Sequence, residues 1–301
     1  MRTSTFRAMN TDISVLAPDD APYFEDTVET ARTTFETVED CLSRFRPESE
    51  LCALNRSGGT PFTASPLLFR VVKLALDAAR ATAGAFDPTI LPALESAGYD
   101  RSFEHLNVRR SSGGVALLEA PSSIDYRSVR LDPARSTITL RPGSRIDLGG
   151  IGKGFAVDLA IERTADTPHR CINAGGDIAV RGTPGSGSGW TIALEDGGER
   201  AGETVSIVDS ALATSTISKR RWISDGREQH HVIDPRTRRP SDGPFRTVSV
   251  VARTCVQADV AAKATLVLGD AGIELLQELG LHGIAIHHDE TVSTTRDWPR
   301  S

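Results

Sequence analysis

The order in which two hydrophobic periodicities occur along the chain constrains its fold more than any other feature. In the first third, apolar residues recur at steps close to the helical period of 3.6. Beyond residue 136, short β-rich runs are separated by clusters of Gly, Pro, Asp and Ser, which is typical of strands joined by turns. Helices first and then many strands, without a regular βαβα alternation, predict an α+β fold.

The helical part contains two periodic segments that follow a short expected strand at residues 12–17. The first segment places apolar side chains on one face at Phe24, Val28, Phe35, Val38, Leu42 and Phe45. The second covers residues 66–83, stops at Gly84, and turns one face inward with Leu67, Val71, Leu74, Ala75 and Ala78. Two later helices are expected, one from about Gly154 and one from about Val256 to Leu279.

The strand-rich part is expected to form one domain with the helical part. Residues 103–123 are rich in Ser, Arg and Gly and have no period, so they predict a loop or insertion rather than a boundary. The chain is therefore interpreted as a single domain, residues 1–301, with subdomains of uncertain boundaries. The expected strands are residues 137–141, 145–148, 169–174, 177–181, 190–195, 203–209, 230–233 and 246–252.

Composition and charge exclude several classes of protein. The formal net charge of −6 and the lack of a basic block with interleaved aromatics argue against nucleic acid as a partner. No apolar run is long enough for a transmembrane segment, and the first residues lack a signal-type core, so a cytoplasmic location is expected. The cysteines are far apart in sequence, which indicates neither a zinc site nor a disulfide framework: Cys41, Cys52, Cys171 and Cys255.

A glycine-rich turn at residues 146–154 (I-D-L-G-G-I-G-K-G) leads from an expected strand into a helix. Backbone amides at such a turn can hold a phosphate, and Lys153 would add charge, but a tight structural turn is about as common. The spacing fits neither a Walker A motif nor a G-x-G-x-x-G fingerprint. A second glycine pair, Gly175-Gly176, allows a ligand or another backbone to come close.

Several short blocks occur in a fixed order over nearly the whole chain. They are Met9–Thr11 (M-N-T), 42–55 ending in Asn55, Gly84–Thr89 (G-A-F-D-P-T), Asp147–Asp158 (D-L-G-G-I-G-K-G-F-A-V-D), Asn173–Asp177 (N-A-G-G-D), Ala213–Ser215 (A-T-S), His231–Thr237 (H-V-I-D-P-R-T) and Ala258–Lys263 (A-D-V-A-A-K). Each block is weak alone, but the succession resembles the FAD:protein FMN transferase family, the ApbE-like flavin transferases.

The resemblance implies a T-fold-related architecture with mixed sheets, flanking helices and a FAD cleft between two packed subdomains. It implies a flavoprotein transferase that moves FMN from FAD to a Thr or Ser of an acceptor protein, a covalent protein flavinylation in which AMP leaves. It makes His231 and Lys153 the catalytic residues, since imidazole suits proton abstraction near neutral pH. The FAD-binding residues that it implies are Met9, Asn55, Asp87, Thr89, Lys153, Gly175, Gly176, Asp177, Thr214, Ser215 and Asp234.

Metal binding is the point at which the sequence departs from the family's pattern. The resemblance implies Mg²⁺ with metal-site positions at Gly152, Asp259 and Lys263, but the family's last block usually has Thr where this chain has Lys263. One helical turn separates Lys263 from Asp259, so the two side chains can meet. Either they form a surface ion pair beside bound magnesium, or the ammonium takes the cation's place and metal dependence is weakened or lost.

Two other functions remain open on the sequence. A FAD pyrophosphatase would let water attack the same phosphorus and release FMN and AMP. A non-catalytic flavin-binding or scaffold protein would keep the FAD site without the chemistry, because of Lys263. Arg238, where a turn glycine is common in the family, would be strained if its φ is positive, and could add a cation for phosphate.

Overall fold

The computed structural model describes residues 1–105, 124–185, 187, 189–194, 203–224 and 226–299. Most of the loop expected at 103–123 therefore lies outside the described residues. The chain divides into two compact units. Unit 1 comprises Met1–Glu39, Ile151–Thr216 and Pro244–Ser301, and unit 2 comprises Asp40–Gly150 and Ile217–Gly243.

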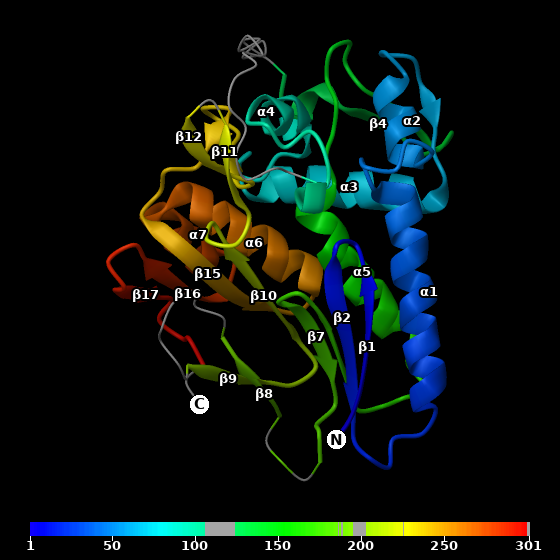
Figure 1. Ribbon diagram of the computed structural model, residues 1–301, viewed down its shortest axis with the longest axis vertical. Helices are drawn as coiled ribbons and strands as arrows, with labels where there is room; N and C mark the ends of the chain where they lie inside the picture. Colours follow the sequence, from blue (N-terminus) through cyan, green and yellow to red (C-terminus); the bar gives the residue numbers. More distant parts are fainter. Residues whose placement is uncertain (106–123, 186, 188, 195–202, 225, 300–301) are drawn as a thin grey trace. The chain divides into compact units, whose positions relative to one another are not determined.

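Unit 1 is built on an eight-stranded sheet in the described residues, with the order β1-β2-β6-β7-β10-β15-β16-β17 (Figure 1). Every neighbouring pair in this sheet is antiparallel. The strands are β1 (Arg2–Ala8), β2 (Thr11–Ala17), β6 (Arg170–Ala174), β7 (Asp177–Arg181), β10 (Ala211–Thr216), β15 (Phe245–Ala252), β16 (His282–His287) and β17 (Val292–Thr294). With helices covering it, the sheet confirms the predicted α+β class.

The two faces of this sheet have different coverings. Helices α5 (Gly149–Arg163) and α6 (Cys255–Leu268) lie on one face, where α6 packs against β7, β10 and β15. The hairpin of β8 (Trp190–Ala193) and β9 (Thr204–Ile207) covers the other face. Its core joins residues from the sheet and the hairpin: Cys171, Ile178, Val180, Trp190, Val205, Ile207, Leu212, Val251, Ile284 and Trp298.

The remaining helices follow from apolar stripes and caps. Helix α1 (Phe24–Leu42) packs on β1 through Phe35 and Phe6, whose ring centroids lie 6.0 Å apart. Thr254 caps α6 by accepting the N–H of Gln257. Gly269, at φ 63°, ends α6 and starts α7 (Asp270–Glu278). A left-handed glycine is a common helix stop, and here it turns the chain between two helices.

Unit 2 has short helices and three small sheets among its described residues. The helices are α2 (Glu50–Arg56), α3 (Pro66–Ala81) and α4 (Leu91–Ser96), with the 3₁₀ turns η1 (Pro88–Ile90), η2 (Phe103–His105) and η3 (Tyr126–Ser128). The sheets pair β3 (Phe62–Thr63) and β4 (Arg130–Asp132) with β5 (Thr137–Thr139), β11 (Arg221–Ser224) with β12 (Arg227–His230), and β13 (Ile233–Asp234) with β14 (Arg239–Pro240). Ala93, Leu94, Tyr99, Trp222 and Ile233 form one of its buried clusters.

Several expected elements differ from those observed. Residues 145–148 form no strand, α5 begins at Gly149 instead of near Gly154, and the helix expected up to Leu279 is broken at Gly269. Strands β1, β10, β16 and β17 were not predicted. The buried face of α3 is also shifted from the predicted one, and consists of Leu68, Val71, Val72, Ala75, Leu76 and Ala79.

Within the part of the chain that the structure describes, no helix combines the length and apolar character needed to cross a membrane.

Candidate functional site

Two tight hairpin turns in unit 1 carry predicted site residues. Met9 and Asn10, at φ 49° and 58°, join β1 to β2. Gly175 and Gly176, at φ 62° and 97°, join β6 to β7. Two-residue turns with positive φ at both positions match the twist of the strands that they join. Asn at position 10 is tolerated because Asn adopts this conformation more readily than most residues.

The two turns lie next to one another because β2 pairs with β6. A Cβ atom built on Gly175 would lie 2.2 Å from Oγ1 of Thr11, so no larger residue fits there without movement. The side chain of Asn173 closes the second turn by accepting the N–H of Gly176 at 2.9 Å. Glycine at position 175 is therefore required by the packing of one turn against the other.

Lys153 and Asp177 form an ion pair between α5 and the start of β7. The Asp177 side chain is 1% exposed and that of Lys153 is 17% exposed. The pair lies directly after the glycine turn, so an ammonium group and a tight backbone turn come together at one end of the sheet. The Lys153 ammonium, which is partly exposed beside this turn, can bind an anionic ligand.

Thr214 and Ser215 lie on opposite faces of β10, because side chains alternate along a strand. Thr214 shares its face with Ser249, and their hydroxyl oxygens are 2.8 Å apart. Ser215 is on the face that Asp177 shares through the pairing of Ala213 with Asp177. Of these two residues, Ser215 is thus the one whose side chain lies on the face that carries Lys153 and Asp177.

Helix α6 carries the second lysine–aspartate pair. The Lys263 ammonium contacts Oδ1 of Asp259, one turn earlier on the helix. Asp259 is 1% exposed at its side chain, and Lys263 is 20% exposed. Among the described residues, Oδ2 of Asp259 is buried and accepts no hydrogen bond. This is not the surface ion pair that was one of the two sequence interpretations, since its carboxylate is almost fully buried.

Helices α5 and α6 are joined at the N-terminus of α6. Asp158 of α5 accepts the N–H groups of Cys255 at 2.7 Å and Val256 at 2.9 Å. A Cβ built on Gly154 would lie 3.0 Å from the carbonyl oxygen of Cys255, so glycine permits this close approach. The carboxylate and the glycine together fix where α6 begins relative to α5.

Charges on both helices act on one buried thiol. Burial, followed by the charges of Asp158 and Asp259, raises the pKa of Cys255 well above its ordinary value, while Lys153 and Lys263 oppose the shift. Burial also raises the pKa of Asp158, against the hydrogen bonds from α6, and the charge of Asp259 adds to the rise. The charges of Lys153, Lys263, Asp158 and Asp259 therefore all act on this one thiol in unit 1.

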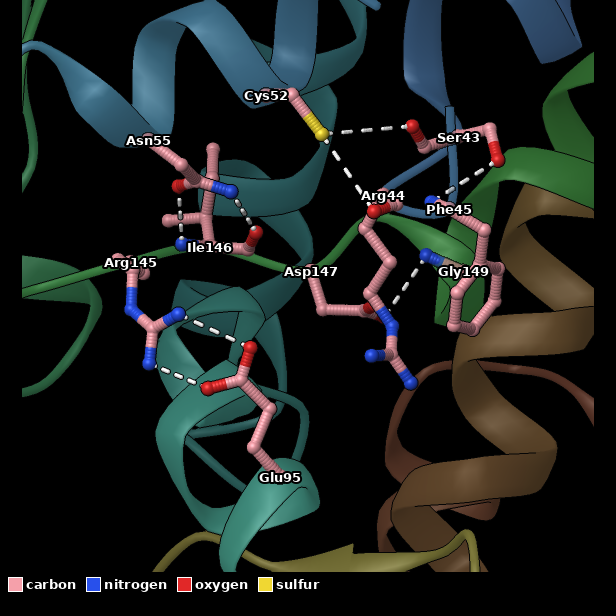
Figure 2. A network of polar contacts seen from close by, with 10 residues as sticks. All are labelled: Ser43, Arg44, Phe45, Cys52, Asn55, Glu95, Arg145, Ile146, Asp147 and Gly149. Atoms are coloured by element: carbon pink, nitrogen blue, oxygen red, sulfur yellow. Dashed lines mark hydrogen bonds and ion pairs between the residues drawn. The ribbon is translucent and has the colours of Figure 1, made fainter. Parts of the chain in front are cut away.

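In unit 2, the segment that was expected to be a strand is held by side chains instead (Figure 2). Asn55 of α2 accepts the N–H of Ile146 at 2.8 Å and donates to the Ile146 carbonyl at 2.9 Å. Asp147 accepts the N–H of Gly149 at 2.9 Å. Its other oxygen lies 2.9 Å from Nε of Arg44. The amide group of Asn55 thus positions the backbone just before the glycine-rich turn.

Asp87 and Thr89 also bind backbone in unit 2. Oδ1 of Asp87 accepts both the N–H and the hydroxyl of Thr89 at 2.7 Å, and Oδ2 accepts the N–H of Tyr126 at 3.1 Å. Pro88, between them, accepts the N–H of Asp147 at 2.8 Å. Burial raises the pKa of Asp87, and these hydrogen bonds and the charge of Arg238 oppose the rise.

The two neighbouring histidines differ in their surroundings. His230 is buried at the end of β12, and its Nε2 lies 2.9 Å from the carbonyl oxygen of Ser241. His231 is half-buried in the bend that follows β12. The hydrogen bond to Ser241 gives His230 a structural role, which leaves His231 as the candidate base.

Asp234 and Arg238 are linked within one short loop of unit 2. Asp234 is buried and accepts the N–H of Arg236 at 2.8 Å and pairs with its guanidinium. Arg238 has φ 59°, so the residue that replaces the expected turn glycine adopts a left-handed conformation. Its Nη1 donates to the Thr89 carbonyl at 3.4 Å. The N–H of Arg238 donates to the Asp234 carbonyl at 2.8 Å, so Asp234, Arg238 and Thr89 belong to one connected network.

The predicted site residues thus gather in two sets, one in each unit. Unit 1 contains Met9, Gly152, Lys153, Gly175, Gly176, Asp177, Thr214, Ser215, Asp259 and Lys263, and unit 2 contains Asn55, Asp87, Thr89, His231 and Asp234. Across the described ranges, no group of three or more His, Cys, Asp or Glu side chains could hold a metal ion.

Sequence reasoning missed one residue of this region and gave another no role. Arg44 was not singled out, although its place beside Phe45 and its pairing with Asp147 put it within the network of Figure 2. Asp158 was noted only as the end of a block, because its two hydrogen bonds to α6 span the sequence from 158 to 256. Neither contact has a local sequence signal.

A model of the ApbE family matches residues 9–285, which is most of the chain. The chain belongs to the ApbE family. Among its relatives, the FAD:protein FMN transferase of Treponema pallidum is 30% identical over 291 residues, covering 88% of this chain and 78% of that protein. The FAD:protein FMN transferase of Vibrio cholerae is 28% identical over 249 residues, covering 78% of this chain and 71% of that one.

Solved ApbE structures have the same fold. The ApbE protein of Thermotoga maritima superposes with a TM-score of 0.88 at 23% identity, covering 98% of this chain and 97% of the other. The flavin transferase ApbE of Vibrio cholerae gives a TM-score of 0.83 at 23% identity, covering 99% and 97%. These likenesses confirm the predicted fold of the ApbE family.

Proposed function

We propose that this protein transfers the FMN part of FAD to a Thr or Ser hydroxyl of an acceptor protein. Membership of the ApbE family supports the proposal, since relatives that share most of its length are named FAD:protein FMN transferases. The observation that carries it is the Lys153–Asp177 pair beside the Gly175–Gly176 turn, since it places a partly exposed ammonium group where it can bind a diphosphate. FAD is then the substrate that donates the flavin.

In the proposed reaction the acceptor hydroxyl oxygen forms a bond to the FMN phosphorus. The bond from that phosphorus to the bridging oxygen breaks, and AMP leaves with the electron pair. His231 takes the hydroxyl proton, and Lys153 offsets the charge that develops on the phosphate oxygens. The remaining predicted residues bind FAD or hold the backbone around it: Met9, Asn55, Asp87, Thr89, Gly175, Gly176, Asp177, Thr214, Ser215 and Asp234.

The donor set predicted for magnesium does not suit that ion. Mg²⁺ takes oxygen ligands in octahedral geometry, whereas the Gly152, Asp259 and Lys263 set contains an ammonium group that contacts the carboxylate. Only Oδ2 of Asp259 is left to accept a bond among the described side-chain atoms of this set. In the proposed reaction Lys153 and Lys263, rather than a metal ion, supply the positive charge near the phosphates.

The proposal is tested by incubating the purified protein with FAD and an acceptor domain that carries a Thr flavinylation site. Covalent in-gel flavin fluorescence on the acceptor, with equimolar AMP, is expected. The same acceptor with that Thr changed to Ala is the control and should stay unlabelled. Free FMN without label would indicate the pyrophosphatase, and intact FAD would indicate a binding or scaffold protein.

A second arm tests the assigned base. His231→Gln should retain FAD affinity and lose at least about a hundredfold in transfer rate, because general-base catalysis contributes about 10²–10⁴-fold. Near wild-type transfer by this variant would exclude His231 as the base without excluding the reaction.

A further inference from the structure

Arg44 is a buried cation with an unused hydrogen-bond donor. Its side chain is 8% exposed, and within the described residues its Nη2 has no hydrogen-bond partner. Buried polar groups in native proteins are almost always paired, and leaving a charged donor unpaired is costly. An unpaired guanidinium nitrogen therefore indicates an acceptor that the described residues do not supply.

The guanidinium group is held firmly from several sides (Figure 2). Its Nε pairs with Asp147 at 2.9 Å, and its central carbon lies 4.2 Å from the ring centroid of Phe45 and 4.6 Å from that of Tyr99. The thiol of Cys52 donates to the carbonyl of Arg44 at 3.5 Å. The side chain and the backbone of Arg44 are thus both held in place by contacts.

The surroundings decide what kind of acceptor fits. The ring centroids of Phe45 and Tyr99 lie 4.2 and 4.6 Å from the central carbon of the Arg44 guanidinium, so its Nη2, unpaired among the described residues, belongs to a group packed among aromatic side chains. Since the aromatic rings lie against the guanidinium, hydrogen bonds are left to its edge. An edge donor among aromatic side chains is complementary to a ring carbonyl on a planar heteroaromatic ligand.

We infer that Arg44 is a flavin-ring ligand, and that its Nη2 donates a hydrogen bond to a carbonyl oxygen of the isoalloxazine of FAD. The inference rests on the proposed function, because that function supplies the flavin. Asp147 then positions Arg44 as well as the N–H of Gly149, so one carboxylate links the ring-binding group to the start of the glycine-rich helix.

Two partial ligands separate ring binding from phosphate binding: riboflavin has the ring without phosphate, and ADP has the diphosphate without the ring. Arg44→Gln should weaken FAD and riboflavin binding at least about tenfold, the loss typical of a hydrogen bond to a charged group, and change ADP binding less than about twofold. Arg44→Lys should lose a similar factor, because an ammonium lacks the planar fork. Arg46→Gln, in the same loop and exposed, is the matched control.

Arg44→Gln leaves Asp147 buried without its partner, so folding is checked with the charge-balanced Arg44→Gln/Asp147→Asn variant. That variant should also lose ring affinity and keep ADP affinity. Equal losses for riboflavin and ADP, or no loss for either, would overturn the inference. If wild-type protein binds FAD and labels an acceptor but Arg44→Gln does so with unchanged affinity, only the role of Arg44 fails. Failure of the wild-type protein to bind FAD would instead reject the proposed function.

Discussion

Lys263 contacts Asp259 across one turn of α6, and this carboxylate is 1% exposed at its side chain. Breaking such a buried pair leaves an uncompensated charge, whereas exposed pairs contribute little. The pair therefore places a fixed positive charge in unit 1 at the position where the sequence resemblance implied a metal.

The first prediction concerns metal dependence. We expect FMN transfer by the wild-type protein to change less than about twofold after chelation with EDTA. Lys263→Thr supplies a hydroxyl instead of an ammonium, so this variant should lose at least about tenfold in rate without Mg²⁺ and recover with it. Lys73→Thr, which breaks the exposed pair with Asp77, is the control and should behave as wild type.

Saturable activation of the wild-type protein by Mg²⁺ would contradict this prediction. A Lys263→Thr variant whose transfer rate does not change on chelation would contradict it as well. Direct titration of the protein with Mg²⁺ in a calorimeter gives a readout that does not depend on activity. The wild type should give no saturable heat, and Lys263→Thr should give one.

The second prediction concerns the stacked turns. Gly175→Ala should lower the free energy of unfolding by about 1–2 kcal/mol for the left-handed backbone and about 1–3 kcal/mol more for the clash with Thr11. Thr11→Ala should relieve the second part, which a double-mutant cycle in denaturant measures. Gly58→Ala has the same φ of +62° but nothing nearer than 3.9 Å, so it should show the backbone cost alone.

The third prediction concerns the amide of Asn55. Asn55→Asp keeps the acceptor for the Ile146 N–H but places an oxygen opposite the Ile146 carbonyl. The free energy of unfolding should fall by about 1–3 kcal/mol. Asn10→Asp, whose oxygen accepts a bond from the exposed Arg7, should change it by less than about 0.5 kcal/mol. Equal effects of the two variants would show that the bridge to Ile146 contributes nothing.

The fate of residues 145–148 shows where sequence reasoning stops. Ile146 and Leu148 are buried and alternate with Asp147, which is why the segment reads as a strand. In the structure the backbone groups of Ile146 bond to a side chain distant in sequence, so no ladder forms. A local pattern cannot reveal a partner that lies far along the chain.

The helices show one feature that the apolar period predicts and one that it does not. The apolar period of α1 predicted its position because the residues that recur at helical spacing are the ones that the helix buries. The apolar pattern of residues 256–279 continues across Gly269, so the period alone does not show the break that its left-handed backbone makes. For the site, the order of blocks located the glycine turns and Asp259, but the pairing of Arg44 with Asp147 depends on tertiary contacts.

The fourth prediction uses the raised pKa of Asp87, whose largest cause is burial. Because the folded-state pKa lies above the unfolded one, its contribution to stability is present at low pH and is lost as pH rises through the folded pKa. The stability of wild type minus that of Asp87→Asn should therefore decrease as the pH rises above the ordinary aspartate pKa of about 3.9. Denaturant unfolding at several pH values measures it, and a difference that is constant or increases with pH would refute it.

The joint between α5 and α6 has a consequence for motion. Asp158 holds the first amides of α6, and Gly154 leaves no gap for a side chain between the two helices. Sliding or rotating α6 would break the hydrogen bonds of both amides to Asp158 and would move the Cys255 carbonyl into α5. Lys153 of α5 and Lys263 of α6 therefore lie on two helices that are held together as one rigid pair. A bulky residue in place of Gly154 would displace both ammonium groups without contacting either.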